Sequence, residues 1–529
     1  MSRLSLAAAL GALVLVCTGC SGGSGSPNNA GATRPATTTD CPPLGTDLDK
    51  NATFTWMYSV DATSFDKDKI TSNNSQMYLY PIYDSLVHID AAGTPQPMLA
   101  KSWKLLDDGK TLEMSLIDNW KYHDGVPFDA ASVKANIERA KTLPQSFNKN
   151  PLKSVLSIDV VDAHTVRFHT DGGAGSLVGV LGGSPGMMMS PAAFNKPGED
   201  VKPTGGSGAF RLTNYVPGSR VEYTPVDNYW DPKALNIGKL VFTISGDDNA
   251  RLNAVQTGAA DVTFLRASMY QPAKQGGLTV CEAPSLSSYS LNLNTSRSEF
   301  GKQKVRQAID YALDRTAVAQ VTEGFCTPTV QMFPSTYFAS NPDIKPERYG
   351  HDTAKAKQLL ADAGLPNGFS FNLEVINLSL YQQIAEVMQA NLAEVGIKMS
   401  ITPVDISRLA EDFSVKKSAD AIFFEQKAES DPSTLTAEYY LASGFNNPGG
   451  LTTDQITQLQ AETRKGATAA ERSPAFGKLF TAVTDQAGPN IPVCSLTTPF
   501  AMDKKARGVE IYTDASRQFR GVGIARNPN

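Results

Sequence analysis

Histidine is scarce in this sequence, and the few copies are scattered. The five histidines stand at positions 88, 123, 164, 169 and 351, and no two of them form a pair at metal-ligand spacing. Basic residues do not outnumber acidic ones: 48 Lys and Arg stand against 53 Asp and Glu, for a net charge of −5. The basic surface that nucleic-acid binding requires is therefore missing. We expect no cofactor, no metal and no nucleic-acid partner.

Apolar segments long enough to cross a membrane are also missing. The run Leu4–Val16 has about thirteen residues, whereas a membrane-spanning helix needs ~20. It follows the positive start Met1–Arg3 and suits a secretory signal peptide. Cys17-Thr18-Gly19-Cys20 resembles a bacterial lipobox, with Cys17 where Leu is usual; cleavage as an ordinary signal peptide is the alternative. We expect a lipoprotein signal peptide over 1–20, lipidation of Cys20 and a flexible tether over 21–41, which is rich in Gly, Ser, Pro and Thr.

Cysteine is present in a number that allows disulfides in an exported chain. Without Cys17 and Cys20, four cysteines remain, and four cysteines permit three pairings. The sequence does not choose among them. We prefer Cys41 with Cys281 and Cys326 with Cys494, and buried free thiols are the alternative.

The first part of the body has the pattern of β-structure. Asp107-Asp108-Gly109-Lys110 separates Trp103–Leu106 from the alternating run Thr111–Ile117, which predicts a hairpin. Asp129 is a good N-cap for a helix that carries Val133 and Ile137 on one face. This part of the chain is therefore predicted to form a β-rich lobe.

From about residue 289 the pattern alternates between strand and helix. Residues 369–375 and 398–404 alternate as strands, and the apolar face of 384–395 between them is helical. A strand, a helix and a second strand in this order predict parallel strands joined by a right-handed crossover. Residues 421–424 add a short strand. The second part is therefore predicted to form an α/β lobe, and a ligand cleft is expected between the two.

A secreted serine hydrolase is the rival from another functional class. Ser64-Phe65-Asp66-Lys67 has the Ser-x-x-Lys spacing of penicillin-recognising enzymes, but the companion Lys-Thr-Gly is absent. Gly205–Ala209 approaches a Gly-x-Ser-x-Gly motif but ends in Ala. We expect binding without catalysis.

Several short sequences in a fixed order carry a family resemblance. They include Tyr83–Leu86, Leu99–Trp103, Asp108–Thr111, His123–Phe128, Gly206–Phe210, Asp227–Trp230, Val305–Ile309, Tyr311–Arg315, Ala354–Ala356, Ala363–Gly364 and Gly396–Ile397. Together they resemble the bacterial extracellular solute-binding proteins of the peptide/nickel type, family 5, which serve ABC importers. The resemblance covers about residues 50–525.

This resemblance implies an α/β, two-lobed periplasmic-binding-protein-like fold of class II, with an inserted extra subdomain and a ligand cleft between the lobes. Lobe I is then expected over 42–288 plus 495–529, with the inserted subdomain at about 81–204. Lobe II is expected over 289–494. Closure of the lobes around a solute is the implied mechanism.

The same resemblance points to the loop that follows the strand ending near Phe424. Peptide-binding relatives carry an Asp three residues before an Asp-Pro pair, where it holds the α-ammonium of the peptide. Here that position is Ala428, and Glu429 is its neighbour. The candidate ligand-binding residues are Asn73, Asn74, Gln76, Met187, Met188, Asn377, Tyr381, Arg408, Gln426, Glu429, Ser430, Asp431 and Arg517.

The function that follows is capture of an extracytoplasmic small solute for an ABC permease. A short peptide or peptide-like compound is the expected ligand, and an organic acid, sugar derivative or metal chelate is the alternative. We expect a monomer, held at the outer face of the cell membrane by its lipid anchor.

Overall fold

The structure, a computed structural model, describes residues 40–71, 73–426, 429 and 431–527. All of them belong to one compact unit, Thr33–Asn529. No helix in the described part is long and apolar enough to cross a membrane. The predicted signal peptide and lipidated Cys20 lie outside the described residues.

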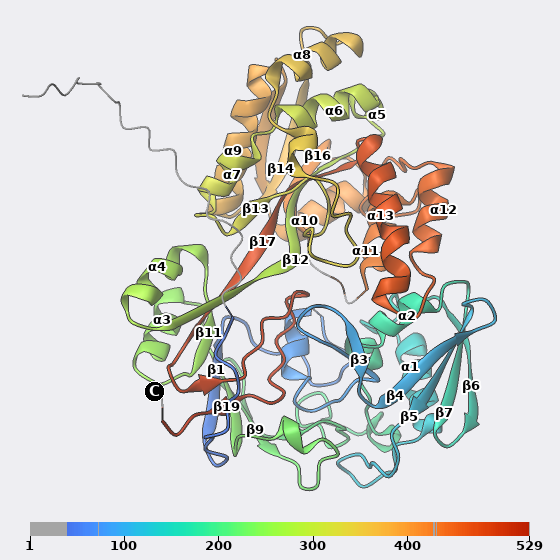
Figure 1. Cartoon of the computed structure of the whole chain (residues 1–529), viewed down its shortest axis with the longest axis vertical. Coiled ribbons are helices and arrows are strands. Elements are labelled where there is room, and N and C mark those ends of the chain that lie inside the picture. The colour runs from blue at the N-terminus through green and yellow to red at the C-terminus, as the bar shows by residue number, and fades with distance from the viewer. Residues whose placement is uncertain (1–39, 72, 427–428, 430, 528–529) are drawn as a thin grey trace, which may run out of the picture. The chain divides into compact units, whose positions relative to one another are not determined.

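A large mixed sheet organises the molecule (Figure 1). Its strands, in spatial order, are β15 (Lys398–Val404), β14 (Ser370–Ile376), β16 (Ala421–Gln426), β12 (Thr279–Leu293), β17 (Asn490–Met502), β11 (Val262–Phe264), β1 (Thr53–Tyr58), β10 (Lys239–Ile244), β9 (Arg220–Pro225) and β8 (Phe210–Val216), with β13 (Cys326–Pro328) paired to β17. We call the part from β11 to β8 lobe I and the part from β15 to β16 lobe II. Strands β12 and β17 run through both.

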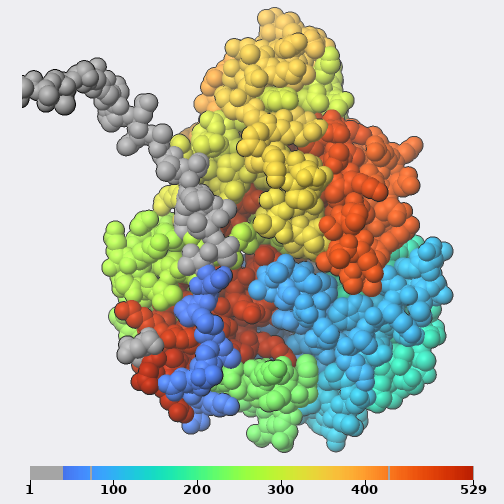
Figure 2. Space-filling view, viewed as in Figure 1, coloured from blue at the N-terminus to red at the C-terminus, as the bar shows by residue number. Residues whose placement is uncertain are grey.

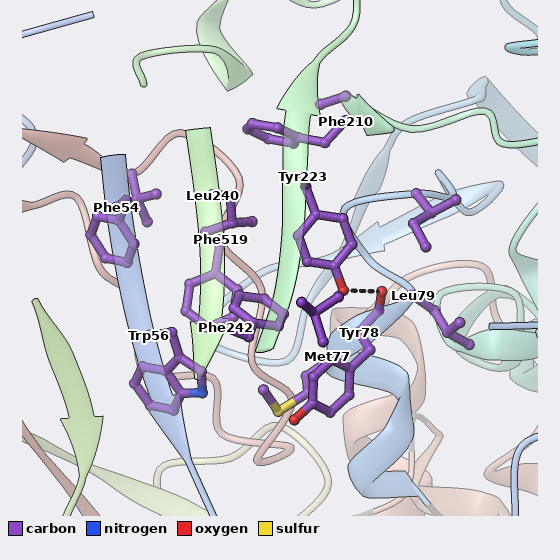
Figure 3. Packing of buried hydrophobic residues seen from close by; sticks show 14 of the residues in the cluster. Phe54, Trp56, Met77, Tyr78, Leu79, Phe210, Tyr223, Leu240, Phe242 and Phe519 are labelled. Carbon is purple, nitrogen blue, oxygen red and sulfur yellow. Dashed lines mark hydrogen bonds between the residues drawn. The ribbon is translucent and has the colours of Figure 1, made fainter. Parts of the chain in front are cut away.

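Lobe I packs its core on the face of β1 and β10. The alternation in β1 buries Phe54, Trp56 and Tyr58, because successive strand residues point to opposite faces. The rings of Phe54 and Trp56 contact the ring of Phe519, which also contacts Phe242; Figure 3 shows these four side chains. The helices α3 (Asp248–Gln256) and α4 (Ala267–Gln275) belong to this lobe.

A second sheet, of four strands, is inserted in lobe I. Its strand order is β4 (Ala100–Leu106), β5 (Thr111–Leu116), β7 (Thr165–Thr170) and β6 (Val155–Asp162), and the short pair β2 (Val87–Ile89) and β3 (Pro95–Pro97) precedes it. The predicted hairpin is confirmed: β4 and β5 pair, and Asp107, Asp108 and Gly109 turn the chain with positive φ. Asp129 accepts from the Ser132 backbone N–H at 2.8 Å and caps α1 (Ala130–Thr142), as predicted.

Lobe II contains the predicted βαβ unit. Strands β14 and β15 are parallel and are joined by α9 (Ser379–Glu394). The other helices of this lobe are α5 (Ser298–Gly301), α6 (Gln303–Ala312), α7 (Arg315–Val321), α8 (Thr353–Asp362), α10 (Ile406–Ala410), α11 (Pro432–Tyr440), α12 (Asp454–Glu462) and α13 (Ala469–Asp485). Because β14 and β16 are parallel too, the chain leaves β14, β15 and β16 at one common edge.

The two long strands β12 and β17 cross between the lobes side by side (Figure 1). Their register shifts between Pro284 and Ser288, so residues 285–287 form a bulge, which we call the crossing bulge. The Leu286 backbone N–H leaves the ladder and donates to the Thr513 carbonyl at 2.7 Å. The C-terminal segment is thereby fixed beside the crossing.

Both disulfides involve the crossing strands. Cys281 on β12 is joined to Cys41, and Cys494 on β17 is joined to Cys326 on β13. This is the pairing preferred from the sequence. The predicted lobe limits at 288/289 and 494/495 fall within these same strands and stay predictions.

The inserted sheet touches lobe II at the turn between α12 and α13. Asp171 pairs with Arg464 at 2.8 Å, and the Trp103 indole N–H donates to the Ala467 carbonyl at 3.4 Å. A Cβ added at Gly175 would lie 2.0 Å from the Gly466 carbonyl oxygen, so the two backbones are in direct contact. We call these contacts the clasp. Figure 2 shows the orange surface of α12 and α13 against the blue and cyan surface of the inserted sheet.

Candidate functional site

The structure brings three of the predicted lobe I residues to one place. Asn74 lies in the short helix η1 (Asn73–Tyr78), and its side-chain oxygen accepts from the Tyr58 hydroxyl at 3.1 Å. The guanidinium of Arg517 stacks on the same Tyr58 ring, 4.6 Å from its centroid. Gln76 lies two residues further along η1, and its side-chain oxygen accepts from the Tyr80 hydroxyl at 3.4 Å. Asn73 begins η1, and its side chain is outside the described residues.

Arg517 has unused hydrogen-bonding capacity. Its Nε is buried without a partner, and Nη1 makes only a long contact of 3.4 Å with the Ala515 carbonyl. No carboxylate in the described residues lies within ion-pair distance of this guanidinium. A half-buried arginine in this state is suited to a carboxylate from outside the chain.

Among the predicted residues, Gln426 most clearly lacks hydrogen-bond partners for its side chain. It is the last residue of β16, its side chain is 1% exposed, and neither its amide oxygen nor its amide nitrogen has a partner. Directly opposite on β12 is Ser288, whose buried hydroxyl is also unpartnered. Buried polar groups are nearly always hydrogen-bonded in proteins, so this pair calls for a partner that the described chain does not supply.

Three carboxyl groups complete the site. Burial, together with the carboxyls of Glu438 and Asp514, raises the pKa of Glu429 to about 7. Burial likewise raises the pKa of Asp514 and of Glu438, with the charge of Arg517 opposing the shift at Asp514 and Lys153 opposing it at Glu438. Asp514 is thus within electrostatic reach of both Glu429 and Arg517, which places the acidic and basic groups in one neighbourhood.

Asp431 was predicted as a ligand contact, and the structure gives it another role. Its carboxylate accepts from both terminal nitrogens of Arg472, at 2.6 and 2.8 Å, and both side chains are less than 5% exposed. It also caps α11 through the Ser433 backbone N–H at 2.9 Å. This carboxylate is used within the fold and cannot reach a solute.

Met187, Met188 and Tyr381, also predicted as ligand contacts, pack inside the lobes. Met187 and Met188 are completely buried in two different cores of lobe I. Tyr381 is 8% exposed and packs edge-on against Tyr289 inside lobe II. Apolar packing, which the sequence cannot distinguish from pocket lining, accounts for all three.

Two further predicted residues lie at the strand edge of lobe II. The Asn377 side-chain oxygen accepts from Gln382 at 3.1 Å, and Arg408 pairs with Asp412 at 2.8 Å while remaining 63% exposed. Neither is brought to Gln426 or Arg517 by a contact in the described chain. Ser430 lies outside the described residues, as does Ala428.

The sequence missed Glu438, Asp514 and Ser288. Glu438 lies in α11, the helix that directly follows the ligand loop, seven positions after Asp431. Its closeness in sequence to the loop could have marked it as a candidate. Nothing in the sequence marks Asp514 or Ser288 as a site residue, because their positions depend on the crossing of β12 and on the fold of the C-terminal segment.

The two serines that resemble nucleophiles are engaged elsewhere. Lys67 is fully buried and pairs with Asp68 at 3.0 Å, and the Ser64 hydroxyl accepts from the Asp66 backbone N–H. Unlike Gly205–Ala209, Gly182–Gly186 is a complete Gly-x-Ser-x-Gly sequence, with Ser184 at its centre. Its hydroxyl is 1% exposed and donates to the Asn148 amide oxygen at 2.7 Å.

The fold and these geometries define a class: a two-lobed α/β protein with crossing strands and unpartnered polar groups beside the crossing is a solute-binding protein. Among the described residues, no group of three or more His, Cys, Asp or Glu could hold a metal ion. Residues 94–447 match the family model of the bacterial extracellular solute-binding proteins, family 5 Middle. The chain belongs to this family.

Named relatives agree with this assignment. The chain is 28% identical over 483 residues to the glutathione-binding protein GsiB of Escherichia coli K12, covering 87% of this chain and 92% of the relative. It shares its fold with HbpA2 from Haemophilus parasuis, with a TM-score of 0.79, 23% identity and coverage of 89% and 99%. It is also similar to DppA from Helicobacter pylori in complex with the peptide STSA, with a TM-score of 0.74, 22% identity and coverage of 90% and 98%.

Proposed function

We propose that this protein captures a short peptide or peptide-like solute outside the cytoplasm and delivers it to an ABC permease. The observation that carries the proposal is the combination of an unpaired guanidinium, Arg517, with carboxyl groups of Glu429 and Asp514 in one neighbourhood. A free peptide carries a carboxylate and an ammonium group, which are the complementary charges.

The unpartnered side-chain amide of Gln426 suits the backbone of such a peptide, between its two charged ends. A primary carboxamide offers one acceptor and two donors, so it can pair with the N–H and the C=O of one extended residue. Ser288 adds a hydroxyl beside it. The names of two relatives, a glutathione-binding protein and a protein solved with a peptide, support a peptide-like ligand.

Arg517 tests this proposal directly. A free tripeptide is expected to bind the wild type about 10- to 100-fold more tightly than its C-terminal amide, because a charge-assisted hydrogen bond to a half-buried guanidinium contributes about 1.5–3 kcal/mol. In Arg517→Gln this preference should disappear, whereas the exposed Arg526→Gln serves as a matched control. Isothermal titration calorimetry with the free tripeptide and its amide measures this preference in each variant. Failure of every tripeptide to bind, with a sugar derivative or organic acid binding instead, would establish the non-peptide alternative.

The clasp is proposed to form when the lobes close on the solute. In Gly175→Ala the added methyl cannot fit against the Gly466 carbonyl, so the ion pair and the indole hydrogen bond of the clasp are lost together. We expect about tenfold weaker solute binding and a larger radius of gyration in the presence of ligand, from contacts contributing about 1 kcal/mol or slightly more. Calorimetry and X-ray scattering measure the two effects.

Gly477→Ala is the control for this substitution, since its added methyl would meet no atom within 4 Å. Unchanged affinity in Gly175→Ala would mean that the clasp plays no part in closure.

The proposal includes lipid anchoring at Cys20, a monomeric state and no catalytic step. The order of a short apolar segment, a tether and a folded body supports the anchor. Intact mass spectrometry that finds the mature protein without acyl chains would contradict the lipid anchor.

A further inference from the structure

Three carboxyl groups stand against two cations beside the crossing: Arg517 acts on Asp514, and Lys153 acts on Glu438. Glu429 follows β16, Glu438 lies in α11, and Asp514 lies in the C-terminal segment, so they come from three separate parts of the fold. None of the three has a cationic partner within ion-pair distance in the described residues. Glu438 accepts only from the Asn446 amide at 3.3 Å, and Asp514 accepts from the Ser516 backbone N–H at 2.9 Å.

Unpartnered groups lie in the same region. Gln426 ends β16 three residues before Glu429, and it faces Ser288 at the end of the crossing bulge. In the crossing bulge, the Leu286 backbone N–H donates to the Thr513 carbonyl, and Asp514 is the next residue after Thr513. The Thr513 hydroxyl is itself buried without a partner. Four side chains with unpartnered polar atoms, Gln426, Ser288, Thr513 and Arg517, therefore accompany the carboxyls, which indicates a polar ligand rather than an acidic surface.

Resting on the proposed function, we infer that the solute is a cationic peptide: it carries a basic side chain in addition to its α-ammonium group. Arg517 takes the terminal carboxylate, and two ammonium groups meet the three carboxyls. Like charges brought together in a partly desolvated place repel one another unless cations join them. An anionic tripeptide such as glutathione would add to that repulsion. This chain is therefore expected to differ in specificity from its glutathione-binding relative.

A matched set of tripeptides tests the inference. We expect Ala-Lys-Ala to bind at least tenfold more tightly than Ala-norleucine-Ala, which has the same chain length without the charge, and Ala-Glu-Ala and glutathione to bind more weakly still. In Glu438→Gln the Lys-to-norleucine ratio should fall at least threefold. The exposed Glu394→Gln on α9 should leave the ratio unchanged.

The outcomes separate the inference from the proposed function. Equal affinities for the Lys, norleucine and Glu peptides would overturn the cationic preference and leave peptide capture intact. Tightest binding of glutathione would also overturn it. Binding of none of the peptides would overturn the proposed function itself.

Binding should also depend on pH with a defined sign. Glu429 has a pKa of about 7, so it is mostly protonated at pH 5.5 and half ionised at pH 7. The groups that face it are Glu438 and the neutral Tyr439 on α11 and Asp514 on the C-terminal segment. Two cations act on these neighbours: the charge of Lys153 lowers the pKa of Glu438, and that of Arg517 lowers the pKa of Asp514. Because the ammonium needs an ionised carboxylate, affinity for Ala-Lys-Ala should rise about tenfold or more from pH 5.5 to 7. Glu429→Gln should flatten this rise, and a flat profile in the wild type would contradict the role of Glu429.

Discussion

Replacing Asp431 with alanine is expected to lower the free energy of unfolding by about 3–5 kcal/mol, because the change leaves the guanidinium of Arg472 buried without its counter-ion. Arg472 lies in α13, and Asp431 is the N-cap of α11. The two hydrogen bonds between them, at 2.6 and 2.8 Å, are joined by one from the Arg472 Nε to the Thr463 carbonyl at 2.8 Å. The pair therefore holds α11, the end of α12 and α13 together.

Urea unfolding measures this loss, and two controls make it specific. The exposed pair of Arg408 and Asp412 should contribute little, so Arg408→Gln is expected to change stability by less than about 1 kcal/mol. The double variant Asp431→Leu/Arg472→Met removes both charges and should be more stable than Asp431→Ala.

The affinity of Asp431→Ala for peptide then decides between two roles. Binding measured on the folded fraction should change little, because Asp431 is fully used inside lobe II. A variant as stable as the wild type that has lost all peptide binding would return Asp431 to the ligand site.

Local patterns in the sequence were sufficient for the elements that stabilise themselves locally. The hairpin at Asp107–Lys110 needs only its turn residues and alternating neighbours, and α1 needs only the Asp129 cap and an apolar face. The parallel pair β14 and β15 follows from the strand, helix and strand order. In each case the deciding interactions join residues that are close in sequence.

The candidate site could be predicted only in part, because its deciding interactions join residues that are far apart in sequence. Asp431 has the sequence of a ligand loop, but its partner Arg472 is 41 residues away and nothing near Asp431 reveals it. Gln426 and Arg517 are candidates on the resemblance, but the sequence could not show that polar atoms of both side chains stay unpartnered. Asp514 is brought beside the crossing only because the C-terminal segment returns to the crossing bulge.

Met187, Met188 and Tyr381 show a related limit of residue type as a guide to the ligand site. Methionine and tyrosine suit an apolar core and a ligand pocket equally well, and only the packing around them separates the two. The structure buries all three within the lobes. Residue type alone therefore overestimates the apolar lining of the site.

Removing either disulfide should lower stability substantially and by nearly equal amounts. Cys41 and Cys281 are 240 residues apart, and Cys326 and Cys494 are 168 apart. The loop-entropy contribution grows only with the logarithm of this separation, so each bond is expected to contribute about 5 kcal/mol, with a difference of only a few tenths between them. Guanidinium unfolding of the variants Cys41→Ala/Cys281→Ala and Cys326→Ala/Cys494→Ala measures both losses.

A difference beyond that small margin would come from the folded state rather than from the unfolded chain. Cys281 lies in the lobe I core beside Met502 on β17, while Cys494 lies in the lobe II core, so each bond fixes a crossing strand within one lobe. Adding a reductant should lower the melting temperature of the wild type and have a much smaller effect when all four cysteines are replaced. Wild-type stability that does not respond to reductant, together with full stability of both double variants, would mean that the folded protein does not depend on these bonds. The exported location expected from the sequence is the setting in which such bonds persist, so their dependence on redox conditions links the fold to the compartment in which it works.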